Sequence, residues 1–446
     1  MESDWRDRPW GLVLSGGGAK GVYEIGVWKA LVALGIQVNA VVGTSAGAIN
    51  ACAYAQGDLP RIEDAWLSMR LSDIAVMPVE LVRELEKAGS GPDPVALLRH
   101  RQALFPKGGI DTAPLRATLG RMLDEKSVRN SGLDVGIITY ELSSLRPVEI
   151  FLEGIPEGTL LDYVMASAAM PIFKRPRIGS REYVDGAVFD NIPVRTLRER
   201  GYRRIIVVDV SGIGVSREVD GAGSITAYVR NSMQMGHILN FEESFLRDYM
   251  ELGRLDTLRV FGEFEGTDYF LQPAPALTAR LEGVLADDAA VASLAPLIGH
   301  KSFSESPSDL RKAIRYLLPK RFAGGRNLMI CLAECAASAL GVQRNRVYNL
   351  PEFLDAIRTV HAASGKKGPG FLDSEFRSFL DRISASLAAV LPKKFEKRTP
   401  FENYRALFPL TFGKTRHPLY GFLEAIHPEL TAALAFLALL DRLPPG

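Results

Sequence analysis

The sequence predicts an α/β fold with a mainly parallel central sheet, followed by a mostly α-helical C-terminal region. Residues 10–15 form a short apolar run that ends at a glycine cluster, as a buried strand does, and residues 22–34 carry apolar side chains at helical spacing. A second apolar run at residues 38–43 leads into a small-residue helix over residues 46–56. Strand, glycine loop, helix, strand, turn and helix in this order are typical of parallel strands joined by helical crossovers.

The rest of the chain sets the predicted domain boundary. Further elements are expected as two strands within residues 133–152, a strand at 203–210, a long helix at 225–252 and a strand near 257–262. Beyond about residue 276 the strand signals fade and amphipathic helices dominate. The sequence therefore predicts an α/β domain over residues 1–275 and a helical domain over residues 276–446.

Composition and charge are those of an ordinary globular protein. Apolar residues make up 47% and charged residues 24% of the 446 positions, which is enough for a sizeable core. The net charge of +1 hides an asymmetry, because residues 276–446 carry 23 Lys and Arg against 16 Asp and Glu, whereas residues 1–275 carry 30 against 36. A basic C-terminal region would suit an anionic membrane surface, and a modest solvated excess explains the same numbers equally well.

Cysteine content and hydropathy bear on the compartment. Cys52, Cys331 and Cys335 are too few for a disulfide framework and indicate a reducing compartment. The last two stand four apart in an apolar helical stretch with no cluster of further ligands, so buried structural thiols are expected in place of a metal site. The N-terminus lacks the apolar core of a secretory signal, and residues 429–443 are too short an apolar segment to span a bilayer. A cytoplasmic location is expected, with peripheral membrane contact left open.

Residues 43–47, Gly-Thr-Ser-Ala-Gly, form a G-x-S-x-G pentapeptide between a predicted buried strand and a predicted helix. This is the context of a nucleophile elbow, in which Gly43 and Gly47 permit a sharp turn that presents the Ser45 hydroxyl. The following helix would direct its free N–H groups and the positive end of its dipole toward an oxyanion formed there. A packing turn of small residues is the alternative interpretation of the same string.

The loop Gly-Gly-Gly-Ala-Lys-Gly at residues 16–21 admits two interpretations. Gly16, Gly18 and Gly21 satisfy the dinucleotide-binding pattern G-x-G-x-x-G, which also requires an acidic residue about 20 positions later, at the end of the second strand. That strand ends in the serine elbow instead, so a nucleotide cofactor is not expected. The other interpretation is a concave set of N–H donors for a tetrahedral oxyanion, with Lys20 either adding positive charge or simply solvated.

A third motif, residues 183–194, contains the candidate base. Asp185 stands at a predicted strand end before Gly186 and Ala187, where small residues allow the carboxylate to approach a neighbouring strand. Asp-Gly-Ala alone is a common turn signal and gains meaning only from the two motifs before it. The six histidines lie outside any motif, and the serine follows the second strand. A Ser-Asp-His hydrolase, whose elbow comes later in the chain, is therefore disfavoured.

In this order and spacing, the motifs resemble those of the patatin-like phospholipase family over roughly residues 10–260. The glycine loop, the serine elbow and the Asp-Gly-Ala base motif all match the family pattern. Secondary features agree, with Ala166-Ser167 before Met170-Pro171 and Asn191-Ile192-Pro193 after the base. Lys20 departs from the arginine of many relatives, which keeps the charge but loses the planar fork of the guanidinium.

The resemblance implies a three-layer α/β/α domain that hydrolyses fatty acyl esters of phospholipids or lysophospholipids without a metal or organic cofactor. It implies that Ser45 is the nucleophile and Asp185 its base. It also implies that the N–H groups of Gly16, Gly17 and Gly18 form the oxyanion hole. The residues implied to support these motifs are Lys20, Gly21, Gly43, Gly47 and Gly186.

Other functions remain open from the residues alone. The chain could be a partner-regulated effector or scaffold with latent acyl hydrolase activity, or an acyltransferase. The helical region could be a lid, a membrane-docking module or a partner-binding domain, whereas nucleic acid is not expected as a partner. Two basic clusters would suit anionic headgroups or are ordinary solvated helix faces: Arg311, Lys312, Arg315, Lys320 and Arg321 in the first, and Lys393, Lys394, Lys397 and Arg398 in the second.

Overall fold

The computed structural model of the chain describes residues 8–77, 109–212, 214–215, 224–295, 306–322, 327–363 and 428–443. The chain divides into two compact units, Met1–Gly262 and Glu263–Gly446. This boundary lies earlier than the predicted one, because the residues just after it pack into the second unit. Tyr269 and Leu271 belong to the hydrophobic core of that unit, and Phe270–Leu271 (β9) pairs with its Val347–Tyr348 strand (β10).

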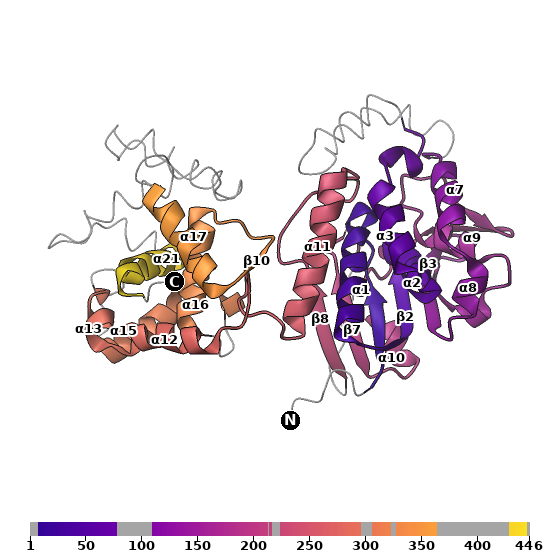
Figure 1. Ribbon diagram of the computed structural model, residues 1–446. Coiled ribbons are helices and arrows are strands. Elements are labelled where there is room, and N and C mark those ends of the chain that lie inside the picture. Colours follow the sequence, from indigo (N-terminus) through magenta and orange to yellow (C-terminus); the bar gives the residue numbers. More distant parts are fainter. Residues whose placement is uncertain are drawn as a thin grey trace. The chain divides into compact units, whose positions relative to one another are not determined.

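The first unit is built on an eight-stranded sheet with the order β5-β6-β3-β2-β1-β7-β8, in which β4 also pairs with β3 (Figure 1). The strands are β1 (Trp10–Leu14), β2 (Val38–Thr44), β3 (Asp134–Glu141), β4 (Arg146–Phe151), β5 (Arg177–Ile178), β6 (Arg181–Asp185), β7 (Arg204–Asp209) and β8 (Ile225–Arg230). The pairings among β3, β2, β1, β7 and β8 are parallel, whereas β4, β5 and β6 pair antiparallel. The predicted mainly parallel sheet is confirmed.

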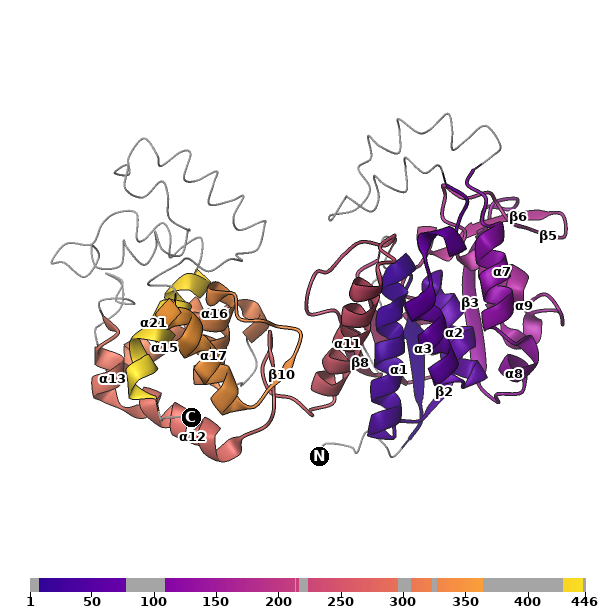
Figure 2. The same cartoon turned by 45° about the horizontal axis from the view of Figure 1, so that its top comes forward.

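Helices cover both faces of this sheet. They are α1 (Val22–Leu34), α2 (Ala46–Gln56), α3 (Leu59–Ser68), α7 (Ala113–Met122), α8 (Glu125–Arg129), α9 (Leu160–Ser167), α10 (Val194–Glu199) and α11 (Glu243–Val260). Helices α1 and α11 lie side by side in both views, in front of the sheet in Figure 1 (Figures 1 and 2). On the other face Val13, Val42 and Val207 form a core cluster with Leu197 of α10. Because strand side chains alternate between faces, one apolar strand serves both helical layers.

Two predicted elements of this unit are wrong. Residues 225–252 are not one helix, because Ile225–Arg230 is strand β8 and the helix α11 begins only at Glu243. The strand predicted near 257–262 is the end of that helix and the turn that follows it. In β8 the buried Ala227 and Val229 flank the half-exposed Tyr228, which is the alternation of a strand at the edge of a sheet. The predicted helix spanned both β8 and the loop that leads to α11, so its range combined two different periodicities.

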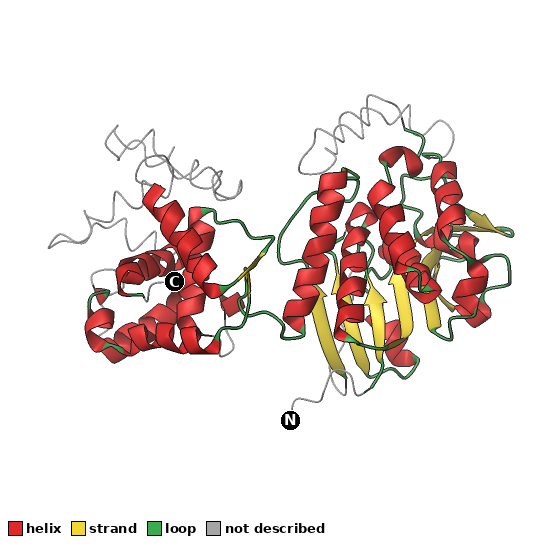
Figure 3. Cartoon of the chain, in the orientation of Figure 1, coloured by secondary structure: helices red, strands yellow, loops and turns green. Residues whose placement is uncertain are grey.

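The second unit is mostly helical, as predicted, with one small parallel pair of strands, β9 and β10 (Figure 3). Its helices are α12 (Pro275–Ala286), α13 (Asp288–Ala292), α15 (Pro307–Leu317), α16 (Leu328–Leu340), α17 (Leu350–Ala363) and α21 (Pro428–Leu439). Cys331 and Cys335 are buried on α16 and are not joined in a disulfide, as expected of structural thiols. The apolar C-terminal segment forms α21 and packs its side chains into the core. Within the described ranges, no helix combines the length and the apolar character needed to cross a membrane.

The first basic cluster of this unit is largely neutralised within the fold. Arg311 pairs with Asp288, Lys312 pairs with Asp309, and Arg321 contacts both Asp268 and Glu429. Side chains committed to such pairs are less available to an anionic surface, so the described residues give little support to headgroup binding here. The second cluster, Lys393, Lys394, Lys397 and Arg398, lies outside the described residues.

Candidate active site

Ser45 occupies a sharp turn between β2 and α2. Its backbone has φ 57° and ψ −123°, a strained conformation that non-glycine residues rarely adopt. The flanking glycines are sterically required, because a Cβ on Gly43 would lie 2.0 Å from the Gly47 carbonyl oxygen. A Cβ on Gly47 would lie 2.3 Å from that of Leu14. The pentapeptide therefore has the geometry of a nucleophile elbow, not that of an ordinary packing turn.

Strand β3 aligns Ser45 with Asp185. In the register of the sheet, Ile138 of β3 pairs with Thr44 of β2, and the next residue, Thr139, pairs with Asp185 of β6. Along these same residues, strand β4 pairs with the opposite edge of β3. Strands β2 and β6 therefore share one edge of β3, and β6 begins to pair at the point where β2 ends. The serine after β2 and the aspartate at the end of β6 thus meet at one point of one strand.

At that point the two side chains form a hydrogen bond. The Ser45 hydroxyl donates to Asp185 Oδ2 at 2.7 Å, and the Ala187 N–H donates to Asp185 Oδ1 at 2.8 Å. Gly186 permits this approach, since a Cβ there would lie 2.3 Å from the Ile138 carbonyl oxygen. Asp185 is only 3% exposed, so the carboxylate is almost completely removed from water.

Burial changes the acidity of this carboxyl. Removal from water raises the pKa of Asp185 to about 6, and the hydrogen bonds from Ala187 and Ser45 oppose the rise. A carboxylate with a pKa in this range is ionised at neutral pH and is a better proton acceptor than an ordinary aspartate. The site therefore combines a strained serine with a buried carboxylate of raised basicity.

Ser167, the last residue of α9, contacts the backbone of Ser45 and belongs to the site. The sequence alone did not predict this role. The Ser167 hydroxyl accepts the Ser45 N–H at 2.8 Å and donates to the Ile138 carbonyl at 2.6 Å. It thereby fixes the backbone of the elbow to β3 while remaining fully buried. The available signal was the Ala166-Ser167 pair before Met170-Pro171, which marked a matching feature without indicating a role.

The glycine loop is anchored by Asn191. The Gly16 N–H donates to the Asn191 carbonyl at 3.2 Å, and the Asn191 Nδ2 donates back to the Gly16 carbonyl at 3.3 Å. In this conformation Gly16 is therefore committed to the fold and does not offer its N–H to a ligand, unlike the predicted role. Among the described residues, the N–H groups of Gly17 and Gly18 have no hydrogen-bond acceptor. Gly18 lines the same pocket as Ser45.

Lys20 and Gly21 are the last two residues of the glycine loop, and both are buried. Lys20 is 6% exposed, so its interpretation as a solvated side chain is wrong. Burial lowers the pKa of Lys20, and the nearby Asp209 carboxylate opposes that shift by favouring the charged ammonium. A Cβ on Gly21 would lie 2.9 Å from that of Ala46, so glycine allows the loop to pack against the start of α2.

A small apolar pocket of about 50 Å³ opens beside Ser45. Its walls include Trp66, Met69, Leu115, Phe173, Ile238 and Phe241, and Ser45 is the one polar residue among its described lining. The segment that carries Ile238 is held against the glycine loop, because its carbonyl accepts the Ala19 N–H at 2.8 Å. The pocket can hold apolar groups next to the serine, and in this conformation it is small.

His237 is buried, and its Nδ1 accepts the N–H of Leu239 at 3.3 Å. In the ranges that the structure describes, no group of three or more His, Cys, Asp and Glu is arranged to hold a metal ion. The hydrogen-bonding partner of the Ser45 hydroxyl in this structure is a carboxylate.

Fold and site together define an α/β protein with a serine elbow, a glycine-rich loop and an aspartate brought to the end of one parallel sheet. The same region matches the sequence model described as patatin-like phospholipase, over residues 12–198. The matched region includes both Ser45 and Asp185, so the part of the chain that carries the candidate site is similar to patatin-like phospholipases.

Individual relatives resemble part of the chain. "Lysophospholipase NTE1" of Cryptococcus neoformans is 26% identical over 223 residues, which are 49% of this chain and 12% of that protein. "Patatin-like phospholipase domain-containing protein 6" of Mus musculus is 25% identical over 203 residues, 45% of this chain and 13% of that protein. The match thus spans only about an eighth of the length of these relatives. Among solved structures, VipD from Legionella pneumophila aligns over 96% of this chain and 90% of its own, with 14% identity and a TM-score of 0.34.

Proposed function

We propose that the chain is a lipid acyl hydrolase that cleaves fatty acyl esters of phospholipids or lysophospholipids, with Ser45 as nucleophile and Asp185 as base. The observation that carries this proposal is the 2.7 Å hydrogen bond from the Ser45 hydroxyl to the buried Asp185 carboxylate. The match of residues 12–198 to the patatin-like phospholipase model supports the class of reaction. The relative named a lysophospholipase supports the class of substrate.

In the proposed acylation step, Ser45 Oγ attacks the ester carbonyl carbon while its proton moves to Asp185 Oδ2. The C–O bond to the lipid alcohol then breaks, and the alcohol leaves with the proton that Asp185 received. In deacylation, Asp185 takes a proton from a water molecule that attacks the acyl-serine, and Ser45 regains its hydrogen as the fatty acid leaves. No further proton carrier is needed, because the same carboxylate serves both steps.

The negatively charged oxygen of the tetrahedral intermediate is proposed to accept hydrogen bonds from the N–H groups of Gly17 and Gly18. Both lack an acceptor among the described residues, and Gly18 lines the pocket together with the serine. The start of α2 adds the positive end of a helix dipole, because Ser45 is the residue that precedes its first turn. A correctly placed donor lowers the barrier by roughly 3 kcal/mol. Gly16, whose N–H is held by Asn191, is not included.

A second candidate, a regulated enzyme with latent activity, is favoured by the small volume of the pocket beside Ser45. One water molecule needs roughly 10–15 Å³ of such space, so the cavity of about 50 Å³ is far too small for a fatty acyl chain. Ile238, Leu239 and Phe241 form one wall of it. Under this candidate, the segment that carries them must move away from the glycine loop before substrate can bind.

A hydrolysis screen with phospholipid, lysophospholipid and acylglycerol substrates tests the proposal. Ser45→Ala and Asp185→Asn should each lower kcat by about 10⁴-fold or more, while the exposed Ser68→Ala and Asp64→Asn serve as matched controls with unchanged rates. Hydrolysis at the wild-type rate by purified Asp185→Asn would rule out the dyad. A fluorophosphonate separates the two candidates, because a latent enzyme labels at Ser45 only after an activating partner or lipid surface is added.

A further inference from the structure

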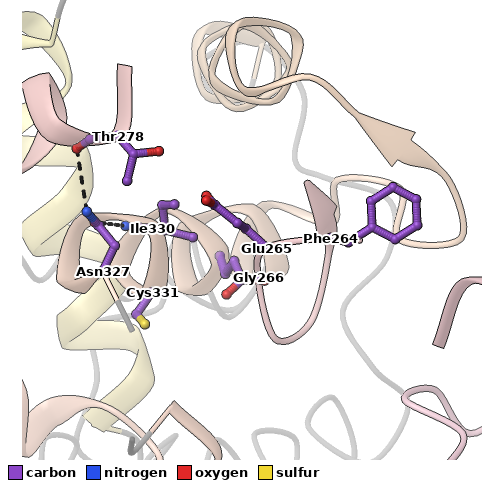
Figure 4. Close-up of a pocket in the computed structure, with 8 residues that line it drawn as sticks. Phe264, Glu265, Gly266, Thr278, Asn327, Ile330 and Cys331 are labelled. Atoms are coloured by element: carbon purple, nitrogen blue, oxygen red, sulfur yellow. Dashed lines mark hydrogen bonds between the residues drawn. The ribbon is translucent and has the colours of Figure 1, made fainter. Parts of the chain in front are cut away.

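A pocket of about 320 Å³ lies in the second unit, between α12 and α16 (Figure 4). Two acidic side chains, Glu265 and Glu334, are part of its lining. Glu334 is 0% exposed and its Oε1 accepts three backbone N–H groups, so a molecule in the pocket cannot reach this carboxylate. Glu265 is hydrogen-bonded to Thr278. A stronger candidate for a binding surface lies in the first unit, at the end of the sheet that carries Ser45.

Two hairpins extend this sheet beyond Ser45, and β5 and β6 of the second one project from the unit in Figure 2. The hairpins lie side by side, because the Leu142 N–H donates to the Glu182 carbonyl at 2.8 Å and the Glu182 N–H donates to Ser143 Oγ at 2.9 Å. Strand β3 runs parallel to β2, so both turns lie past the end of the sheet where Ser45 follows β2. We call residues 142–146 and 174–181 together the hairpin surface.

The hairpin surface is continuous with a wall of the serine pocket. Met170 and Phe173 line that pocket, and Lys174 follows Phe173 directly in the chain. Backbone hydrogen bonds fix this connection, since the Phe173 N–H donates to the Met170 carbonyl at 2.8 Å and the Lys174 N–H donates to the Ile110 carbonyl at 2.9 Å. A partner that covers the hairpin surface would therefore lie close to the pocket that contains Ser45.

The hairpin surface carries an excess of positive charge. Its cations are Arg146, Lys174, Arg175, Arg177 and Arg181, and the carboxylates paired with them are Asp111, Glu141 and Glu182. Five cations against three carboxylates leave an excess of two. Arg175 and Arg177 share Glu182, and their side chains are 62% and 68% exposed. Arginines that share one carboxylate and face solvent keep a positive potential that attracts an anionic partner.

Leu145, the last residue of the β3–β4 turn, is an apolar residue in an unfavourable position. Its φ of 55° lies in the left-handed region, which glycine and asparagine adopt far more readily than leucine. Its side chain is 70% exposed, so it contributes little to the core. The Tyr140 hydroxyl holds the turn by donating to the Leu145 carbonyl at 2.9 Å. A leucine that stabilises neither the turn nor the core is explained by a partner that accepts an apolar side chain.

We propose that the hairpin surface docks the chain on an anionic phospholipid bilayer. Leu145 would enter the boundary between headgroups and acyl chains, and Arg175 and Arg177 would contact lipid phosphates and carboxylates. The partly exposed Ile172 and Ile178 lie next to these arginines in the sequence and add apolar contact. The inference extends the proposed function, because it places the pocket of Ser45 beside the membrane that would supply the lipid substrate.

The two other possible occupants match these features less well. A second copy of the chain would bring an equally cationic surface against this one, and like charges repel. A nucleic acid would satisfy the arginines through its phosphates but would leave the exposed Leu145 without an apolar partner. A bilayer with anionic headgroups offers both negative charge and an apolar interior.

Co-sedimentation with vesicles tests the proposal, using the full chain with Ser45→Ala so that binding is measured without hydrolysis. Failure of the proposed reaction would thus leave this test intact. Vesicles of equimolar phosphatidylcholine and phosphatidylserine should bind the protein, and binding should weaken as the salt concentration rises. Vesicles of phosphatidylcholine alone should bind much less. Equal binding to the two kinds of vesicle, or no binding to either, would overturn the proposal.

Variants locate the surface. Arg175→Gln combined with Arg177→Gln should weaken binding to the anionic vesicles by about tenfold or more. Leu145→Asn should weaken it by about fivefold or more, because the apolar side chain is lost. Since asparagine suits the left-handed backbone, this variant should be at least as stable as the wild type, which a purely structural role of Leu145 would not give. Wild-type binding by either folded variant would overturn the proposal.

Matched controls lie at the opposite end of the sheet. Val32, near the end of α1, is 60% exposed, and Arg8 and Arg203 are exposed just before β1 and β7. Val32→Asn and the combined Arg8→Gln and Arg203→Gln should bind vesicles as the wild type does, and circular dichroism establishes that each variant is folded. Sedimentation velocity tests the second copy as occupant. Self-association of the wild type that Leu145→Asn abolishes would make this surface an interface between copies and overturn the proposal.

Discussion

The Ser45 hydroxyl donates to Asp185 Oδ2 at 2.7 Å, although the two residues are 140 positions apart in the chain. Their meeting depends on the register of β3, where consecutive residues pair with Thr44 and with Asp185. Because the carboxylate is buried and its pKa is raised to about 6, its protonation state is the first property of the site that a pH titration would reveal.

Hydrolysis should depend on pH through the ionisation of Asp185. The base must be unprotonated to accept the serine proton, so kcat/KM should rise with pH through an apparent pKa of about 6 and then level off. An ordinary aspartate would give a rise near pH 4. The measurement is a pH–rate profile with an uncharged acyl ester, and a profile that is flat from pH 4 to 8 would contradict Asp185 as the base.

The same burial makes Asp185 costly for stability at neutral pH. Its folded-state pKa lies above the unfolded value, so its favourable contribution is complete at low pH and is lost as the pH rises through about 6. Asp185→Asn removes this penalty and should be more stable than the wild type at pH 8, by about 1–3 kcal/mol. Urea unfolding at pH 4 and pH 8 checks the sign. The advantage of the variant should shrink at the lower pH, and an advantage that grows there would refute the assigned shift.

Ser167→Ala should damage catalysis more than substrate binding. Its hydroxyl holds the Ser45 N–H and links it to β3, so its loss frees the elbow and leaves a buried donor unpaired. We expect kcat to fall by about 10–100-fold with KM little changed, and stability to fall by about 1–2 kcal/mol. The rate of fluorophosphonate labelling at Ser45 separates positioning from general destabilisation. Labelling at the wild-type rate in a folded Ser167→Ala protein would limit Ser167 to a structural role.

Gly186→Ala should displace the base. A Cβ there would lie 2.3 Å from the Ile138 carbonyl oxygen, a backbone atom that cannot move without breaking the sheet. We expect a loss of about 1–3 kcal/mol in stability together with a fall in kcat. Gly120→Ala is the matched control, because a Cβ there would lie 3.8 Å from its nearest neighbour on a helix. Full activity in Gly186→Ala would show that the carboxylate tolerates a shifted backbone.

The sequence predicted those features of the site that depend on local structure. A strand followed by a turn of small residues and a helix has few alternatives, so the positions of Ser45 and of the glycine loop follow from the pattern. The pairing of Ser45 with Asp185 depends on sheet register, and the sequence indicated it only weakly, through the Asp-Gly-Ala motif, until the resemblance to a family supported it. The N–H of Gly16 and the wall formed by Ile238 depend on tertiary contacts, to Asn191 and to Ala19, that no local pattern encodes.

In the rest of the fold, too, the sequence predicts features that depend on local structure and misses those that depend on tertiary packing. Strand β8 and helix α11 were merged into one predicted helix, because a short half-exposed strand resembles one face of an amphipathic helix over a few residues. The boundary between the units was placed too late, since Tyr269 and Leu271 are apolar in either unit and only packing assigns them. Glu334 is the one acidic residue in the apolar helix α16. Its neighbours in the sequence do not indicate that its carboxylate accepts the N–H groups of Thr267, Asp268 and Tyr269.

A last prediction concerns the stability of the structure that supports the glycine loop, in which Glu24 and Gly21 both accept hydrogen bonds from Asn50. Glu24 is completely buried, its Oε2 accepts Asn50 Nδ2 at 2.7 Å, and its Oε1 has no partner within the described residues. Burial raises the pKa of Glu24 well above its usual value, so the group stabilises the fold in its protonated form and loses that contribution as the pH rises.

Two variants separate the charge of Glu24 from its shape. Glu24→Gln keeps the shape and the acceptor for Asn50 without a titrating proton, so it should match or exceed the wild-type stability at pH 8. Glu24→Ala removes the acceptor and leaves a cavity, which should cost about 2–4 kcal/mol. Asn50 also accepts the Trp66 indole N–H at 2.9 Å, and Trp66 lines the serine pocket. The alanine variant should therefore also lower activity, whereas equal losses of stability in both variants at pH 8 would mean that Glu24 acts as a charged group.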